Sequence, residues 1–292
     1  MKIALFGKSF ADDRFFYFQQ LVEKLEESAI SIMIYAPFYD YVKSKAVFTK
    51  TPGIFNDHHQ LPGVADFMFS IGGDGTMLDA ISLIRDSGLP LMGINLGRMG
   101  FLSSISKNEI GQAVDAILRS EYSLNKRSLL SVETKGNLFG ELNYAMNELT
   151  INKKDSGSMI LLHVYINDLL LNSYWADGLI ISTPTGSTAY SLSCNGPIIT
   201  PDSENFVITP IAPHNLTVRP VVIPDKSVIK IKVDGRMSQY LAGLDSRSAI
   251  IDSSTELLVR KASFCVNLVQ RTNDNFFTTI RQKLLWGHDI RN

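Results

Sequence analysis

The 292-residue sequence has few cysteines and no excess of either charge sign. Its two cysteines, Cys194 and Cys265, cannot form a disulfide framework and lack the CxxC spacing of zinc or redox sites. A formal net charge of -1 gives no basic surface bias of the kind expected for a non-specific nucleic-acid binder. We therefore expect free buried thiols and no nucleic-acid partner.

Long hydrophobic runs are also missing. No window approaches about 18 uninterrupted apolar residues, and the apolar stretch that follows Met1 is too short for a signal peptide. No internal repeat or low-complexity segment is visible. We expect a cytoplasmic protein with no membrane partner, and its length allows two domains.

Two common nucleotide-binding motifs are absent. Gly7-Lys8-Ser9 resembles the end of a P-loop, but that pattern needs a glycine at position 2, where this chain has Lys2. No GxGxxG follows the first predicted strand, so the dinucleotide-binding Rossmann fingerprint is missing as well. A bound nucleotide must be held in another way.

The first part of the chain alternates strand and helix patterns. Strands are predicted at residues 3–6, 30–35, 67–70 and 91–94, and helical spacing is predicted over residues 15–25, 76–85 and 110–118. From residue 128 to about 270, β-branched residues and alternation dominate. The pattern predicts an α/β N-terminal domain with a parallel, Rossmann-like sheet and a mostly-β, sandwich-like C-terminal domain.

A helical pattern returns at residues 276–286, and this C-terminal helix is expected to pack back on the first domain. The predicted domains are therefore 1–122, 123–270 and a returning segment, 271–292.

Residues 71–76 read Ile-Gly-Gly-Asp-Gly-Thr and lie between a predicted strand and a predicted helix. Glycine backbones can approach a polyphosphate closely, and free N–H groups at a helix start favour anions. Asp74 would repel a phosphate there unless it binds Mg²⁺ or accepts a proton from an attacking hydroxyl. The loop is consistent with phosphoryl transfer, although an ordinary strand-to-helix turn is the alternative.

A second glycine-rich stretch, residues 93–102, also follows a strand and carries Arg98. Ligands of open α/β sheets collect outside the carboxyl ends of the strands, so both loops could face one crevice. Arg98 could then hold a phosphate, whereas the alternative is a tight turn with a solvated arginine.

Two polar features stand out in the β region. Asn147 and Glu148 combine an amide, which can read an adenine edge, with a carboxylate, which can grip a ribose diol; a surface turn is the alternative. Residues 177–201 are dense in hydroxyls and include Tyr190, whose ring offers a stacking face. This run fits a site for a small polar ligand better than a capped helix.

Four stretches in fixed order together resemble the NAD kinase family: Gly72 to Thr76, Gly97 to Leu102, Asn147-Glu148, and Asp177-Gly178 through Thr185 to Tyr190. The first motif also occurs in lipid kinases and phosphofructokinases, whereas the Thr-Pro-Thr-Gly-Ser-Thr-Ala-Tyr run is far more specific. The resemblance implies transfer of the γ-phosphoryl of ATP, with Mg²⁺ or another divalent cation, to the 2′-hydroxyl of the adenosine ribose of NAD.

The resemblance also implies roles for particular residues. Asp74 would be the general base, Asn147 and Glu148 would contact adenine and a ribose hydroxyl, and Asp177 would lie at the nicotinamide end. The expected NAD-binding positions are Asp74, Gly75, Asn147, Glu148, Ser158, Trp175, Asp177, Thr188, Ala189, Tyr190, Ser191, Leu192, Ser193 and Arg247. The expected ATP or phosphate positions are Gly72, Gly73, Gly75, Thr76 and Arg98. Family members are homo-oligomers, so a homodimer or homotetramer is expected.

The sequence departs from the family pattern at three positions. Family members usually carry Asp-Gly-Gln or Asp-Ser-Gln late in the β region; of the two candidates here, 234–236 and 245–247, the second fits the strand order better and places Arg247 in the site. The guanidinium could hold a phosphate. Trp175 and Ser158 stand where many relatives have basic or larger polar side chains.

Two other functions compete with this interpretation. A lipid kinase would use the same glycine loop but would need an apolar acyl pocket, which the hydroxyl-rich run disfavours. A non-catalytic dinucleotide sensor would keep Asn147 and Glu148 but would not need Asp74. The five histidines show no ligand spacing, so no metal site built wholly from protein ligands is predicted.

Overall fold

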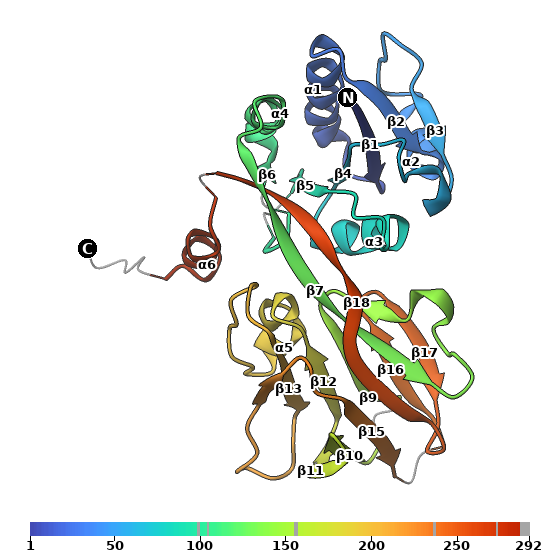
Figure 1. Ribbon diagram of the computed structural model, residues 1–292, viewed down its shortest axis with the longest axis vertical. Coiled ribbons are helices and arrows are strands. Elements are labelled where there is room, and N and C mark those ends of the chain that lie inside the picture. Colours follow the sequence, from blue (N-terminus) through green and yellow to red (C-terminus); the bar gives the residue numbers. More distant parts are fainter. Residues whose placement is uncertain (98–99, 104, 155–156, 236–237, 273, 287–292) are drawn as a thin grey trace. The chain divides into compact units, whose positions relative to one another are not determined.

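The computed structural model describes the chain except for residues 98–99, 104, 155–156, 236–237, 273 and 287–292. The chain forms two compact units. The first comprises Met1–Lys126 and the residues from Val266 onward, and the second comprises Arg127–Cys265 (Figure 1). Two long strands, β7 (Tyr122–Thr134) and β18 (Glu256–Arg271), contribute residues to both units. The domain boundaries expected after residues 122 and 270 stay a prediction.

The first unit contains a parallel sheet. Its strands are β1 (Lys2–Gly7), β2 (Ser31–Tyr35), β3 (Gly53–Phe55), β4 (Phe67–Ile71), β5 (Leu91–Asn95) and β6 (Ile105–Ser106). The order is β18-β5-β4-β1-β2-β3, with β6 paired to β5, and each of these pairings is parallel. The carboxyl ends of β4 and β5, which carry the two glycine loops, are therefore adjacent.

Helices cover both faces of this sheet. They are α1 (Phe15–Glu27), α2 (Ala36–Val42), α3 (Asp74–Ile84) and α4 (Ile110–Leu118), with short 3-10 turns at Asp12–Arg14, His58–Gln60 and Lys107–Glu109. A further helix, α6 (Phe276–Leu284), belongs to the same unit. Met92 and Ile94 of β5 share one core with α1 and α4. Gly93, which points to the opposite face, lies against Met77 of α3.

The second unit is antiparallel in each strand pairing described for it. Besides the two shared strands, its strands are β8 (Tyr144–Ala145), β9 (Glu148–Lys153), β10 (Ile160–Ile166), β11 (Leu169–Ala176), β12 (Gly178–Ser182), β13 (Asn205–Ile211), β14 (Val221–Pro224), β15 (Ile229–Asp234), β16 (Tyr240–Leu244) and β17 (Arg247–Ile251). Short helical turns lie at Gly140–Leu142, Thr185–Thr188 and, as α5, Tyr190–Ser193.

The strands of the second unit belong to two sheets. One has the order β11-β10-β15-β18, and the other has the order β14-β13-β12-β9-β16-β17. A single apolar cluster draws on both sheets, with Leu162 and Ile231 from the first and Leu149 and Phe206 from the second. Alternating inward side chains from two sheets make the core of a sandwich.

The predicted fold class is confirmed, including the return of the C-terminal helix to the first unit. Details differ in three places. The short strand β3 and the helix α2 lie between residues 35 and 67, where no strand or helix was predicted, and α3 begins at Asp74 rather than at residue 76. No helix in the part of the chain that the structure describes is long and apolar enough to cross a membrane.

Candidate active site

The first glycine loop turns the chain from β4 into α3. Gly72 has a φ of +153°, and a Cβ atom at this position would lie 2.4 Å from the Oγ1 of Thr76, so only glycine fits. Gly73 is the N-cap, and Asp74 is the first residue of the helix. The carboxylate of Asp74 therefore lies in the first turn, where the helix dipole favours a negative charge.

Backbone N–H groups of the second glycine loop hold the Asp74 carboxylate. Phe101 donates to Oδ2 at 2.7 Å, while Leu102 and Ser103 donate to Oδ1 at 3.2 and 2.9 Å. A Cβ atom on Gly100 would lie only 1.9 Å from Oδ1, so this glycine makes room for the carboxylate. The structure thus joins the two loops that the sequence singled out, through the side chain proposed as the base.

The start of the second loop is fixed by Asn95, whose Oδ1 accepts the N–H of Gly97 at 2.7 Å. The guanidinium of Arg14 packs against Gly97, since a Cβ atom there would lie 3.1 Å from its Nη1. Arg98, the predicted phosphate ligand, lies outside the described residues. A Cβ atom added to Gly73 or Gly75 would meet no described heavy atom within 4 Å, so the backbones of these two glycines border open space.

In the second unit, Asn147 and Glu148 form a buried polar turn rather than a surface turn. Their relative exposures are 7% and 9%; Glu148 is the first residue of β9, and Asn147 lies in the bend just before it. Asn147 Oδ1 and Glu148 Oε2 are buried without a hydrogen-bond partner among the described residues. Buried polar atoms are almost always paired, so these two acceptors indicate a place for a polar ligand.

The tip of the β16–β17 hairpin holds this turn from one side. Asp245, with a φ of +50°, accepts the N–H of Met146 at 2.8 Å on Oδ2 and those of Asn147 and Glu148 at 2.9 and 3.2 Å on Oδ1. Arg247 donates to the carbonyl oxygens of Leu142 and Tyr144. The carboxylate of Asp245 thus accepts backbone N–H groups of segment 142–148, and the guanidinium of Arg247 donates to backbone carbonyl oxygens of the same segment.

The hydroxyl-rich run holds the same turn from another side. Thr183 donates through Oγ1 to the carbonyl of Met146 at 2.5 Å, and its N–H donates to the carbonyl of Asn147 at 2.9 Å. A Cβ atom on Gly186 would lie 2.2 Å from the carbonyl oxygen of Asn147. The backbone of Asn147 is therefore fixed between Asp245 and the residues that follow β12.

Burial and a neighbouring charge change the titration of Glu148. Burial, reinforced by the negative charge of Asp245, raises the pKa of Glu148 to about 8, although the N–H of Tyr190 acts in the opposite direction. Burial also raises the pKa of Asp245, against the effect of its three N–H donors and Arg247. At pH 7 Glu148 is therefore largely protonated and can donate a hydrogen bond as well as accept one.

Because the pKa of Glu148 is raised in the folded protein, its contribution to the free energy of unfolding depends on pH. The Glu148→Gln variant should lack this dependence. Between the ordinary pKa of 4.5 and about 8, folded Glu148 keeps a proton that the unfolded chain loses, so its contribution to stability falls as pH rises. As the pH rises through this window, the free energy of unfolding of Glu148→Gln should increase relative to that of the wild type by about 1.4 kcal/mol for each pH unit. Urea unfolding at several pH values between 5 and 8 measures the difference. The exposed Glu27→Gln is the control, and a pH-independent difference for Glu148→Gln would contradict the shift.

The run from Thr188 to Ser193 is helical, formed by a 3-10 turn and α5. Tyr190 is 40% exposed and Ser193 is exposed. Ala189 lies between the 3-10 turn and α5, and Leu192 lies within α5 and is half-buried. Ser191 points inward instead, where its Oγ lies 2.8 Å from Thr209 Oγ1. Thr188 Oγ1 donates to the carbonyl of Thr185 at 3.2 Å.

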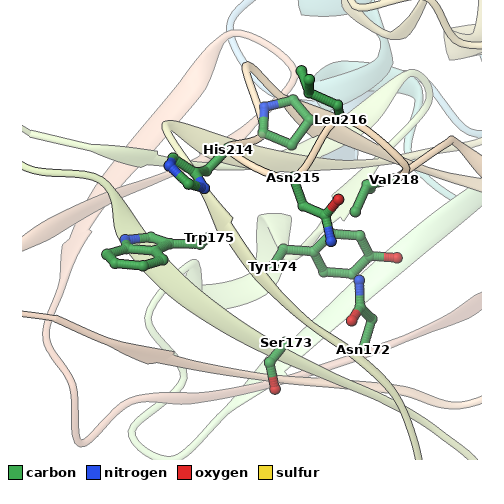
Figure 2. A pocket seen from close by; sticks show the side chains of 9 residues that line it. Asn172, Ser173, Tyr174, Trp175, His214, Asn215, Leu216 and Val218 are labelled. Atoms are coloured by element: carbon green, nitrogen blue, oxygen red, sulfur yellow. The ribbon is translucent and has the colours of Figure 1, made fainter.

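The remaining predicted positions lie elsewhere in the second unit. Asp177 pairs with Lys153 at 2.6 Å, and Ser158 is exposed between β9 and β10. Trp175 lies on β11 and is 58% exposed, with its ring 5.4 Å from that of His214. Both rings line an open hollow of about 560 Å³, together with Tyr174, Asn215 and Leu216 (Figure 2).

Sequence reasoning missed several of these roles. It selected residues 245–247 for Arg247 and gave no role to Asp245. It treated Thr183 only as one hydroxyl of the run 177–201, and it gave no role to Lys283. Burial lowers the pKa of Lys283 on α6, whereas the charge of Asp74 acts to raise it. Among the described residues, no group of three or more His, Cys, Asp or Glu could hold a metal ion.

A parallel α/β unit with an acidic glycine loop and an antiparallel unit with a buried polar turn define a phosphotransferase architecture. The family model for the ATP-NAD kinase N-terminal domain matches residues 19–122, and that for the C-terminal domain matches residues 146–271. The NAD kinase of Cytophaga hutchinsonii is 45% identical over 293 residues, covering 100% of both chains.

Two solved structures share the fold. A crystal structure of yeast NADH kinase complexed with NADH has a TM-score of 0.87 at 23% identity, covering 100% of this chain and 89% of that one. An NAD kinase from Archaeoglobus fulgidus in complex with ATP has a TM-score of 0.74 at 22% identity, covering 98% and 99%. The chain belongs to the ATP-NAD kinase family, and its activity is the ATP-dependent phosphorylation of NAD.

Proposed function

We propose that the chain transfers the γ-phosphoryl of ATP to the 2′-hydroxyl of the adenosine ribose of NAD, giving NADP, with Asp74 as the general base. The observation that carries the role of Asp74 is the set of three N–H groups on its carboxylate. They fix the orientation of the side chain before a substrate arrives, and pre-organised geometry is a main source of rate in phosphoryl transfer.

The two oxygens of Asp74 are used unequally. Oδ1 accepts two N–H groups and Oδ2 accepts one among the described residues, so Oδ2 retains an acceptor position. We assign the ribose hydroxyl to Oδ2. The hydroxyl proton would move to this atom as the oxygen attacks the phosphorus in line with the leaving ADP.

Asn147 and Glu148 are proposed to bind the adenosine part of NAD. Their unpartnered, buried Oδ1 and Oε2 supply an acceptor and, because Glu148 is largely protonated at pH 7, a donor. Tyr190 offers an exposed ring for stacking, and Asp177 is proposed for the carboxamide of nicotinamide. The other proposed NAD contacts are Gly75, Ser158, Trp175, Thr188, Ala189, Ser191, Leu192 and Ser193.

ATP phosphates are proposed to bind the backbones of Gly72, Gly73, Gly75 and Thr76, with Arg98. The open space beside Gly73 and Gly75 supports this assignment.

An ATP-dependent kinase implies a divalent cation, which we propose is Mg²⁺. Mg²⁺ commonly keeps several waters and binds through substrate phosphates, so the ATP phosphates are proposed to hold it while Oδ2 of Asp74 faces the ribose hydroxyl. Bound with ATP, the cation would neutralise phosphate charge.

The relatives support both substrates, since the yeast protein was crystallised with NADH and the Archaeoglobus protein with ATP. A homodimer or homotetramer and a cytoplasmic location stay predictions from the sequence. The lipid-kinase and sensor alternatives lack support from the family assignment.

The proposal predicts that the purified chain makes NADP from NAD, ATP and Mg²⁺. Product is measured with an NADP-specific dehydrogenase, and reactions lacking ATP or treated with EDTA are the controls. Mass spectrometry of the product distinguishes a 2′-phosphate from a 3′-phosphate. A silent assay with intact NAD binding would favour a sensor, and a 3′-phosphate would contradict the assigned acceptor.

A further inference from the structure

One half-buried arginine in the second unit has no ion pair with any described residue. Arg127 lies on β7, just before the fully buried Leu129 and Leu130. Its Nε is buried with no hydrogen-bond partner among the described residues, and its Nη1 reaches only Thr185 Oγ1, at 3.5 Å. Asp202 acts on it through charge alone, from an exposed position.

Two other half-buried arginines have hydrogen-bond partners. Arg271 binds the carboxylates of Glu109 and Asp274 at 2.7 to 3.0 Å. Arg247 donates to two main-chain carbonyls. Arg127 differs from these two, because its Nε has no hydrogen-bond partner among the described residues and its Nη1 has only the long contact with Thr185.

An unpaired buried cation is costly, because a guanidinium has five N–H donors and loses its water on burial. Burial lowers the pKa of Arg127 to about 10, so the group stays charged at pH 7 but in an unfavourable setting. Native proteins rarely bury an arginine that has no partner. The missing partner should be an anion with several acceptor oxygens.

The hydroxyl of Thr185, next to Arg127, indicates which kind of anion fits. Thr185 is 4% exposed and begins the 3-10 turn that contains Gly186, the residue packed on Asn147. A phosphate offers oxygens to both a guanidinium fork and a hydroxyl donor, and arginine is the side chain best suited to bind it in two places. Arg127 as a whole residue is only half-buried, so solvent reaches part of it.

We propose that Arg127 and Thr185 form a phosphate-binding subsite for one of the two nucleotide substrates, either the polyphosphate of ATP or the diphosphate of NAD. This inference rests on the proposed function for the identity of the substrates. It adds Arg127, which the family resemblance did not name, and it gives a ligand to Thr185, which lies in one of the motifs of the resemblance without a stated role. It also gives the guanidinium of Arg127 a charged partner.

The test compares Arg127→Met, Arg127→Lys and wild type. Methionine keeps much of the volume and removes the buried charge, so the melting temperature of Arg127→Met should equal or exceed that of the wild type. The KM for one substrate should rise about 10- to 100-fold, the range of a lost charged hydrogen bond. Arg127→Lys should show a smaller rise, since it keeps the charge without the fork. A rise confined to ATP assigns the subsite to ATP, and a rise confined to NAD assigns it to NAD.

Arg119→Met, at an exposed arginine with no ion pair among the described residues, is the matched control and should leave both KM values unchanged. A second readout needs no catalysis. At equal ionic strength, the melting temperature of the wild type should be higher with tripolyphosphate or pyrophosphate than with sulfate. For Arg127→Met, the melting temperatures with polyphosphate and with sulfate should be the same.

Unchanged KM values for both substrates in Arg127→Met would overturn the proposal. A lower melting temperature with a reduced kcat and unchanged KM values would also overturn it, in favour of a structural role. If the wild type proves to have no kinase activity, the proposed function fails, and the polyphosphate measurement alone decides the subsite.

Discussion

Asp74→Asn should reduce kcat for NAD phosphorylation by about 100- to 10,000-fold while leaving the KM for NAD within a few-fold, because it removes the proposed proton acceptor. The structure adds a second consequence. Both carboxylate oxygens accept N–H groups from Phe101, Leu102 and Ser103, so the amide NH₂ of asparagine must face at least one of these donors. The variant therefore also disturbs the loop that orients the side chain.

These two effects can be separated. Steady-state assays give kcat and KM, equilibrium NAD binding tests the site without catalysis, and thermal unfolding reports the lost N–H contacts. Asp115→Asn, which removes an ion pair with Lys24 between helices α4 and α1 of the same unit, is the matched control for a lost carboxylate. Near-normal turnover by Asp74→Asn would contradict the role of Asp74 as the base, whatever happened to stability.

Local patterns were sufficient to predict the α/β unit. Strand and helix periods alternate through the first 118 residues, and such alternation yields a parallel sheet with covered faces. Helix α2 was missed because its seven residues include Pro37 and three aromatics, a composition without a clear helical period. Strand β3 was missed because three residues at a sheet edge carry too little pattern.

The motifs of the site could be predicted, but their mutual contacts could not. The glycines around Asp74 and the hydroxyls after Asp177 are visible in the local composition. The bond from Met146 to Asp245 spans 99 residues and depends on the pairing of Leu244 with Leu149 between β16 and β9. Such a register follows from packing across the whole sheet, so the sequence could not show that this hairpin tip holds segment 142–148. The NAD-binding role of Arg247 stays a prediction.

Gly186→Ala should destabilise the second unit, although it adds only one methyl group. The added Cβ atom would lie 2.2 Å from the carbonyl oxygen and 2.5 Å from the carbonyl carbon of Asn147. These are backbone atoms, so no rotamer change relieves the overlap. The turn can move only by weakening its bonds to Thr183 and Asp245. We expect a loss of about 1–3 kcal/mol in the free energy of unfolding, the usual cost of overpacking.

The same displacement should raise the KM for NAD by at least about tenfold, because Asn147 and Glu148 would no longer present their unpartnered oxygens as they do in the native turn. Urea unfolding and steady-state kinetics measure the two effects on one preparation. Gly111→Ala in α4 adds a methyl with no heavy atom within 4 Å, and it should stabilise its helix and leave KM unchanged. Asp74→Asn and Gly186→Ala should then differ in kind, since the first lowers kcat and the second raises KM. Wild-type stability together with a wild-type KM in Gly186→Ala would mean that the turn tolerates a shift of Asn147, and that its geometry does not govern dinucleotide binding.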